Sequence, residues 1–265
     1  MATIQKMMSL MGRISNGLNR RGGAPENVSS TLLERHMSYT FGDQKGQVAF
    51  LINNVLNYEK NGLPKNGFFV DLACADAVRF NNTYFLEHYL DWEGLLFEPN
   101  ARFHESIRSR RKSPLVTLCV TDEAEKLVPF RIDNGMLGGI VSEETDNNEK
   151  NRLHELKSAE IVNMKTTTLE KELRQHSSPK LIDFLSLDVE GAEWIVLKDF
   201  PFDEYQFRCM AIERPNKKLD ILLDSCGYRQ VAHLSFDVIY VHKDFLQDMA
   251  WSPNSKFSFT PPKDW

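Results

Sequence analysis

Residues 181–198 have the sequence LIDFLSLDVEGAEWIVLK, in which an apolar run passes through two carboxylates and a glycine into a second apolar segment. The run from Ile182 to Val189 is short and strongly apolar, as is typical of a central strand in a parallel sheet. Asp188, Glu190 and Gly191 lie at its carboxyl end, just ahead of a predicted helix. Ligands bind at this edge of open α/β sheets. The stretch therefore predicts the class of fold and the edge of the sheet that carries a site.

Two further apolar runs also end in carboxylates. Residues 67–73 (GFFVDLA) contain Asp71, and residues 94–98 (GLLFE) end at Glu98. Because the carboxyl ends of parallel strands meet at the same edge of a sheet, we expect Asp71, Glu98 and Asp188 to lie near one another.

The rest of the chain alternates between predicted helices and strands. Helices are predicted over residues 30–58, 83–89, 99–112, 168–175, 192–199 and 219–226, and strands over residues 67–73, 94–98, 115–120, 128–132, 182–189, 207–213, 228–234 and 238–242. This order predicts an α/β fold: a mainly parallel, twisted, Rossmann-like sheet with helices on both faces and a C-terminal antiparallel hairpin. The basic residues that close the helix at 99–112 (Arg108, Arg110, Arg111 and Lys112) are interpreted as a solvated helix end.

Three regions depart from this alternation. Residues 123–165 form a long insertion with a polar, loop-like part at 142–152, and insertions of this length are often functional, for instance as lids. Residues 1–29 form a basic N-terminal segment, and residues 251–265 a C-terminal tail. The domain itself is predicted over residues 30–250.

The N-terminal segment carries basic residues and no acidic residue before position 25, and its apolar residues recur at helical spacing. It is a candidate amphipathic helix followed by a linker. Two interpretations are open. The helix could contact a membrane surface, a partner or a targeting receptor, or it could simply pack on the domain as a terminal segment.

Composition excludes several classes of protein. The formal net charge of −5 argues against nucleic-acid binding, and no apolar run approaches the roughly 20 residues that cross a bilayer. The four cysteines are widely spaced, without a CxxC pair, and are interpreted as buried thiols of a reducing compartment. A cytoplasmic location is expected.

The carboxylates at the predicted sheet edge suit a nucleoside cofactor, because an acid at the end of the second strand can accept hydrogen bonds from both ribose hydroxyls. The turn after the first strand, residues 73–77 (ACADA), lacks the glycine pattern that lets a backbone approach a pyrophosphate. An NAD-dependent oxidoreductase is therefore disfavoured. S-adenosylmethionine, which has no phosphate and carries cationic groups, fits a carboxylate-rich pocket better.

Five segments resemble successive blocks of the FkbM-type methyltransferases, including the branch shared with the animal protein Star. They are GFFVDLACADAVRFNNT (67–83), GLLFEPN (94–100), IDFLSLDVEGAEWIVLK (182–198), AIERPN (211–216) and FDVIYV (236–241). The resemblance covers about residues 47–242. It implies a class I methyltransferase fold and S-adenosylmethionine-dependent methylation of a hydroxyl on a small molecule or a carbohydrate.

The resemblance also assigns roles by position. Glu98 would hold the ribose, residues 120–122 would lie by the adenine, and Asp188 and Glu190 would face the site of methyl transfer. The implied cofactor-binding residues are Asp71, Ala73, Asp76, Asn82, Glu98, Asp122 and Asp188, and the implied catalytic residues are Asp188 and Glu190.

Each of these roles has an alternative. Asp188 or Glu190 could act as the base or orient the acceptor; alternatively, Asp188 could bind the cofactor amine while Glu190 caps the next helix. Glu213 lies at the same edge but could simply pair with Arg214. His233 and Asp237 could face the substrate or serve the hairpin.

No metal site is predicted. Oxygen atoms of Asp188, Glu190 and Glu213 would suit Mg²⁺, but the resemblance gives this no support.

One departure from the family concerns Ala73 and Ala77, where the family usually has glycine. Glycine lets the backbone approach a cofactor without a Cβ atom in the way. Two functions therefore stay open: a methyltransferase, and a non-catalytic binding or trafficking module on the same scaffold.

Overall fold

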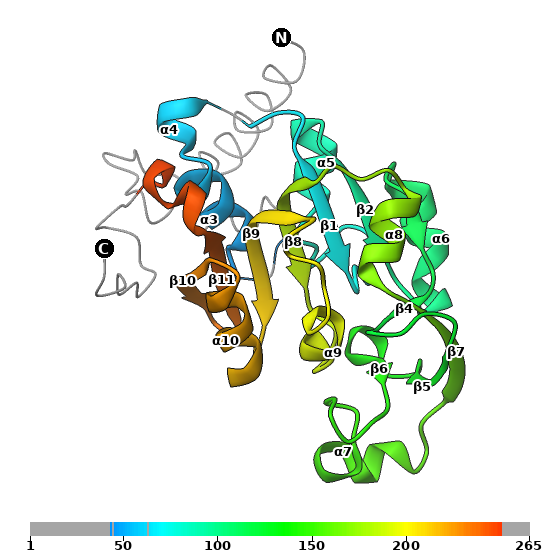
Figure 1. Cartoon of the computed structure of the whole chain (residues 1–265). Helices are drawn as coiled ribbons and strands as arrows, with labels where there is room; N and C mark the ends of the chain where they lie inside the picture. Colours follow the sequence, from blue (N-terminus) through cyan, green and yellow to red (C-terminus); the bar gives the residue numbers. More distant parts are fainter. Residues whose placement is uncertain (1–42, 44, 63, 251–265) are drawn as a thin grey trace, which may run out of the picture.

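The computed structural model describes residues 43, 45–62 and 64–250 (Figure 1). The predicted amphipathic segment 1–29 and the tail 251–265 lie outside the described residues. The described part is a mixed α/β structure with a large, mostly parallel sheet, which confirms the predicted class of fold.

The large sheet has seven strands in the order β10-β11-β9-β8-β1-β2-β3. Their bounds are β1 Phe68–Leu72, β2 Glu93–Phe97, β3 Leu115–Val116, β8 Leu181–Leu187, β9 Gln206–Glu213, β10 Tyr228–Leu234 and β11 Asp237–His242. Strands β3, β2, β1, β8 and β9 pair in parallel, and β11 runs antiparallel to both β9 and β10. This is the strand order of a Rossmann sheet with one antiparallel strand inserted before the last strand.

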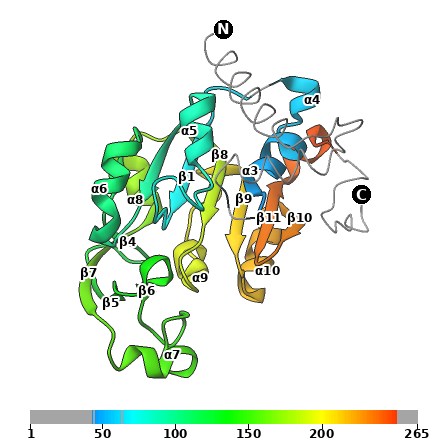
Figure 2. The ribbon, with the colours of Figure 1, turned by 180° about the vertical axis from the view of Figure 1, so that it is seen from behind.

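Helices cover both faces of this sheet (Figures 1 and 2). They are α3 Gln47–Phe50, the π-helical turn η1 Leu51–Val55, α4 Tyr58–Asn61, α5 Tyr84–Leu90, α6 Ala101–Arg110, α8 Leu169–Gln175, α9 Glu193–Leu197, α10 Lys217–Ser225 and the 3-10 segment η3 Lys243–Asp248. Alternate residues of a strand enter opposite cores: Phe69 packs with α5 and α6, whereas its neighbour Val70 packs with α8, α9 and α10.

The helix predicted over 30–58 was correct only in part. Within the described residues, α3 and η1 are continuous over 47–55, and Asn57, which has a left-handed φ of 49°, separates them from α4. Asparagine tolerates this conformation better than most residues, so the break follows from the local sequence.

The insertion forms most of a second sheet, which lies at the bottom of Figure 1, and the strand predicted over 128–132 corresponds to β5. Its elements are β4 Cys119–Val120, β5 Leu127–Arg131, η2 Gly135–Leu137, β6 Gly139–Ile140, α7 Glu149–Leu156 and β7 Ile161–Thr167, and its strand order is β4-β7-β5-β6. The strand predicted over 115–120 is thus divided between two sheets. The loop predicted over 142–152 was wrong from Glu149 onward, because Asn148 caps α7 by accepting a hydrogen bond from the Asn151 N–H.

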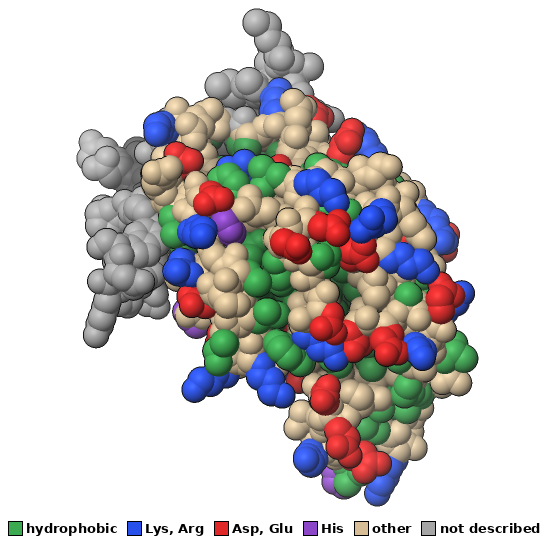
Figure 3. Space-filling view, viewed as in Figure 1, with side chains coloured by type: hydrophobic (Ala, Val, Ile, Leu, Met, Phe, Trp, Pro, Cys, Tyr) green, Lys and Arg blue, Asp and Glu red, His purple; other side chains and the backbone are tan. Residues whose placement is uncertain are grey.

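The described helices include none with the length and apolar character needed to cross a membrane. The four cysteines are free, and Cys74, Cys119 and Cys209 are buried as predicted, whereas Cys226 is only partly buried. On the face shown in Figure 3, basic and acidic side chains are interspersed rather than separated into broad patches.

Candidate active site

The turn that follows β1 has an unusual backbone. Ala73 and Ala75 have left-handed φ angles of 63° and 43°. The N–H groups of Ala73 and Cys74 donate to the carbonyl of Phe97 at 2.9 and 3.1 Å, which folds the turn onto the end of β2. A left-handed residue is where glycine is favoured, so the structure explains a family preference for glycine at position 73.

Replacing Ala73 by glycine should raise the free energy of unfolding by about 0.5–1 kcal/mol, because glycine adopts a positive φ without strain. Ala77→Gly is the matched control: Ala77 is fully buried and lacks a positive φ, so this change should lower stability by about 1–2 kcal/mol through lost apolar contact and added chain entropy. Urea denaturation of the two variants measures the difference. If the two substitutions changed the free energy of unfolding in the same direction, the backbone geometry assigned to Ala73 would be contradicted.

Glu98 lies at the end of β2 and is 3% exposed. Its Oε2 accepts a hydrogen bond from Ala75 N at 2.9 Å, and its Oε1 accepts one from Asn100 N at 2.8 Å. Burial raises its pKa to about 7, although these two bonds oppose the shift. Each oxygen keeps a lone pair for a further donor.

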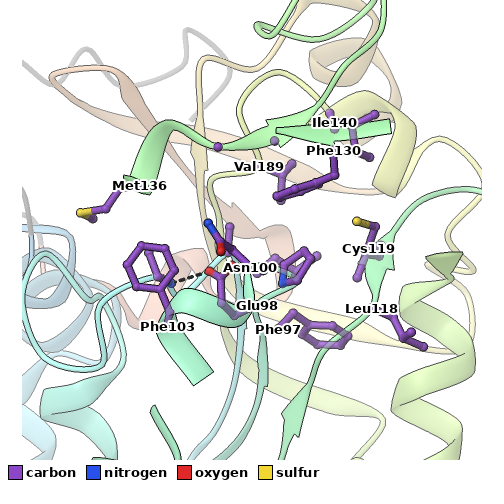
Figure 4. A pocket seen from close by; sticks show the side chains of 18 of the residues that line it. Phe97, Glu98, Asn100, Phe103, Leu118, Cys119, Phe130, Met136, Ile140 and Val189 are labelled. Carbon is purple, nitrogen blue, oxygen red and sulfur yellow. Dashed lines mark hydrogen bonds between the residues drawn. The ribbon is translucent and has the colours of Figure 1, made fainter. Parts of the chain in front are cut away.

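Glu98 lines a mostly apolar cavity between the large sheet and the second sheet (Figure 4). In Figure 4, Phe97 and Leu118 lie below the cavity, Phe130, Ile140 and Val189 lie above it, and Met136 lies toward one side. The insertion thus supplies one wall of this cavity, as a predicted functional insertion would.

A second pocket continues from the first along the carboxyl edge of the sheet. Its acidic lining residues are Asp71, Asp188, Glu190 and Glu213, and its other lining residues are Lys45, Ala73, Cys74, Ala75, Phe80, Asn81, Asn82, Met136, Leu137 and Ser186. The two pockets share Ala73, Ala75 and Met136. They therefore form one cleft with an apolar half and an acidic half, and η2 lies where the halves meet.

Asp71 is anchored by a buried network. Its Oδ2 accepts a hydrogen bond from Thr83 Oγ1 at 2.6 Å, and Thr83 Oγ1 in turn accepts one from Arg111 at 2.9 Å. Arg111 also pairs with Glu87 at 2.7 Å, and the two side chains are 0% and 4% exposed. Burial raises the pKa of Asp71, an effect that Arg111 and Thr83 oppose. The interpretation of Arg111 as part of a solvated helix end was therefore wrong.

Glu190 holds the second sheet against the loop after β8. Its backbone has a left-handed φ of 55°, and its carbonyl accepts a hydrogen bond from Asp146 N at 2.9 Å. The Arg152 guanidinium donates to Glu190 Oε2 at 3.2 Å and to the Leu137 carbonyl at 2.9 Å. Helix α9 has no side-chain cap, so the structure does not support Glu190 as its cap.

Glu193 stabilises the same loop from inside. It is 4% exposed, and its Oε1 accepts hydrogen bonds from the N–H groups of Val189 and Gly191 at 3.1 and 3.2 Å. Burial raises its pKa to about 7. A carboxyl with a raised pKa in the folded state gives stability that is complete below its unfolded pKa of about 4.5 and is lost as the pH rises through about 7.

Glu193→Gln keeps an oxygen for both N–H groups and removes the charge. It should match the wild type in stability near pH 4 and exceed it at pH 8.5 by about 3 kcal/mol. Thermal denaturation at the two pH values measures this. If the stability difference between Glu193→Gln and the wild type were the same at both pH values, Glu193 would not be a buried carboxyl with a raised pKa.

The other predicted site residues are more scattered. Asn82 lines the acidic pocket, donates to Ser186 Oγ at 3.1 Å, and has a buried Oδ1 without a partner among the described residues. Asp76 does not line either pocket but accepts hydrogen bonds from Val78 N and Arg79 N within the turn. Asp122 also lies outside both linings, and its carboxylate is 2.5 Å from Lys198 Nζ.

The remaining candidates lie near the hairpin. His233 is exposed on β10, whereas Asp237 at the start of β11 accepts a hydrogen bond from Gln47. Glu213 pairs with Arg214 at 2.7 Å, the contact that the sequence suggested, yet it also lines the acidic pocket.

A family model described as the methyltransferase FkbM domain matches residues 67–230. The chain belongs to the FkbM methyltransferase family. The match contains the turn after β1, Glu98, the loop 188–191 and Glu213, so the FkbM domain includes both halves of the cleft. Comparisons with curated proteins and with solved structures gave no match.

Sequence reasoning missed three residues of this FkbM site: Arg111, Met136 and Arg152. Arg111 is one of four cations in residues 108–112, Arg152 lies in a polar segment, and Met136 lies in the insertion. Their positions depend on packing between distant segments, so no local pattern marks them.

Proposed function

We propose that this protein is a class I, S-adenosylmethionine-dependent methyltransferase that methylates a hydroxyl group of a small molecule or a carbohydrate. The family match and the Rossmann order of the large sheet support this proposal. The single observation that carries it is the two-part cleft, in which buried Glu98 lines an apolar half and the carboxylates at the carboxyl ends of β1, β8 and β9 line the other half.

The cleft fits the cofactor chemically. Its apolar half suits an adenine ring, and Glu98 has a free lone pair on each oxygen for the two ribose hydroxyls. The unpartnered Oδ1 of Asn82 offers an acceptor to the cofactor's ammonium group in the acidic half. A pyrophosphate would instead face Asp71 and Glu98 without a glycine-rich turn, which disfavours dinucleotides.

Different residues of the cleft would have different roles. When bound, S-adenosylmethionine supplies an electrophilic methyl group. Phe97, Val120 and Ile140 would hold the adenine and exclude water, and Glu98 would fix the ribose. Fixing two reactants in line supplies much of the rate acceleration of such a transfer.

Asp188 is the better candidate for the base. Burial raises the pKa of Glu190, but Arg152 opposes this shift by stabilising the charged form, which makes Glu190 a weaker proton acceptor than it would be without this cation. No cation contacts Asp188 within the described residues, and burial raises its pKa. Glu190 thus positions the second sheet, whereas Asp188 can accept the proton of an acceptor hydroxyl.

Calorimetric titration with S-adenosylhomocysteine tests the proposal, and NAD⁺ serves as the control ligand. We expect micromolar binding of S-adenosylhomocysteine and none of NAD⁺. A folded protein that binds neither would favour the non-catalytic binding module, for which the strained Ala73 is the specific supporting observation.

A further inference from the structure

The strand register brings three carboxylates into a row. Leu187 of β8 is paired with Ile212 of β9 in parallel, so the next residues, Asp188 and Glu213, leave their strands side by side. Glu213 is paired in turn with Asp237 of β11. Carboxylate oxygens of Asp188, Glu190 and Glu213 lie within 4.8 Å of one another. Such crowding of like charges requires compensation.

The cations near this row are distributed unequally. Arg214 lies 2.7 Å from Glu213 and 3.6 Å from Glu190, and Arg152 lies 3.2 Å from Glu190. Asp188 has no such partner in the part of the chain that the structure describes, and burial, followed by the nearby Glu213 carboxylate, raises the pKa of Asp188. Two ionised carboxylates at this separation repel each other, whereas a proton held on one of them removes the repulsion and lets that carboxyl donate to the other.

We propose that Asp188 and Glu213 hold one proton between them in the free protein, and that binding of the cationic methyl donor expels this proton, so that Asp188 becomes the base. This inference rests on the proposed function. Glu213 is a positioning residue: it acts through Asp188, whose protonation it sets. The other charged and titratable groups around the pair are Lys45, Asp71, Asp146, Arg152, Glu190, Glu193, Arg214 and Asp237.

With this assignment, the protons and charges of the reaction are balanced. Asp188 accepts the proton of the acceptor hydroxyl as that oxygen forms its bond to the methyl carbon, while the electron pair of the broken carbon–sulfur bond stays on sulfur. One positive charge is lost at sulfur and one carboxylate is neutralised. The pair therefore ends with the single shared proton from which it began.

S-adenosylmethionine and S-adenosylhomocysteine make this proposal testable without an acceptor. They share the adenosine and the amino-acid group, so protons released by Glu98 or Asp71 should be equal for both. They differ in the positive charge at sulfur, which favours the ionised form of a nearby carboxyl pair. The difference in proton release between the two ligands therefore measures the proton lost by the Asp188–Glu213 pair.

The experiment is calorimetric titration of the full chain with each ligand at pH 7, in two buffers of different ionisation enthalpy and with EDTA present. S-adenosylmethionine should release about 0.5–1 proton more than S-adenosylhomocysteine. Glu213→Gln should reduce this difference at least threefold, because its amide supplies the hydrogen bond to Asp188 and leaves Asp188 ionised. Glu190→Gln is the matched control and should preserve the difference.

Three results would overturn the inference: equal proton release by the two ligands, a difference that persists in Glu213→Gln, or a difference that Glu190→Gln abolishes. In a separate titration without EDTA, saturable Mg²⁺ binding that is lost in Glu213→Gln would also overturn it, since a cation would then offset the charges. Failure of the wild type to bind either ligand would refute the proposed function as well, and so is distinguishable from failure of the proton-sharing pair alone.

Discussion

Arg111→Met should lower the free energy of unfolding by about 3–5 kcal/mol, because it leaves the buried Glu87 carboxylate without its cation. The two side chains are 0% and 4% exposed, and Arg111 also donates to Asn81 and Thr83. Arg111→Met should also disturb the turn that follows β1, since Thr83 holds Asp71. Urea denaturation measures the change.

Arg102→Met is the matched control. Arg102 pairs with Glu160 at 2.6 Å, but both side chains are about half exposed, so its removal should cost about 0–1 kcal/mol. Removing both buried charges, as in Arg111→Met with Glu87→Gln, should recover part of the loss. Equal and small effects of Arg111→Met and Arg102→Met would refute the buried network.

Glu98→Ala should weaken binding of S-adenosylhomocysteine by at least about 100-fold, because charge-assisted hydrogen bonds to both ribose hydroxyls are lost. Glu190→Gln should change this affinity by less than about threefold, since its amide oxygen can still accept from Arg152 and keep the second sheet in place. Calorimetry on both variants measures the contrast. Equal losses of affinity in the two variants would contradict these separate roles of Glu98 and Glu190.

Glu98→Ala also frees the N–H groups of Ala75 and Asn100, so its folding needs a check by circular dichroism. Val120→Phe provides an independent test. It adds a ring inside the apolar half of the cleft and leaves the hydrogen bonds of Glu98 intact, and it should also weaken binding. Unchanged affinity in Val120→Phe would place the adenine elsewhere.

The central strands were predictable because the apolar residues of each strand indicate by themselves that the strand is buried. In β8, Phe184 packs into one core, and the other core contains Ile182, Leu185 and Leu187. Parallel pairing then explains why Asp188 and Glu213 end side by side.

Other features depend on contacts that no local pattern encodes. Arg111 resembles any cation after a helix, yet Glu87 and Thr83 bury it from another helix. Strand β7 has a mixed pattern (IVNMKTT) in which only the last two residues are fully buried, so its pairing with β5 and β4 is what defines it. The left-handed backbone of Ala73 contradicts local preference, as is common at functional sites.

The central claim is that the cleft beside Glu98 binds the nucleoside of the methyl donor, and a crystal structure of the complex with S-adenosylhomocysteine tests it most directly. The account predicts both ribose hydroxyls within hydrogen-bond distance of the Glu98 carboxylate, the adenine between Val120 and Ile140, and the sulfur facing Asp188. A ligand bound with its ribose away from Glu98, or outside this cleft, would contradict it.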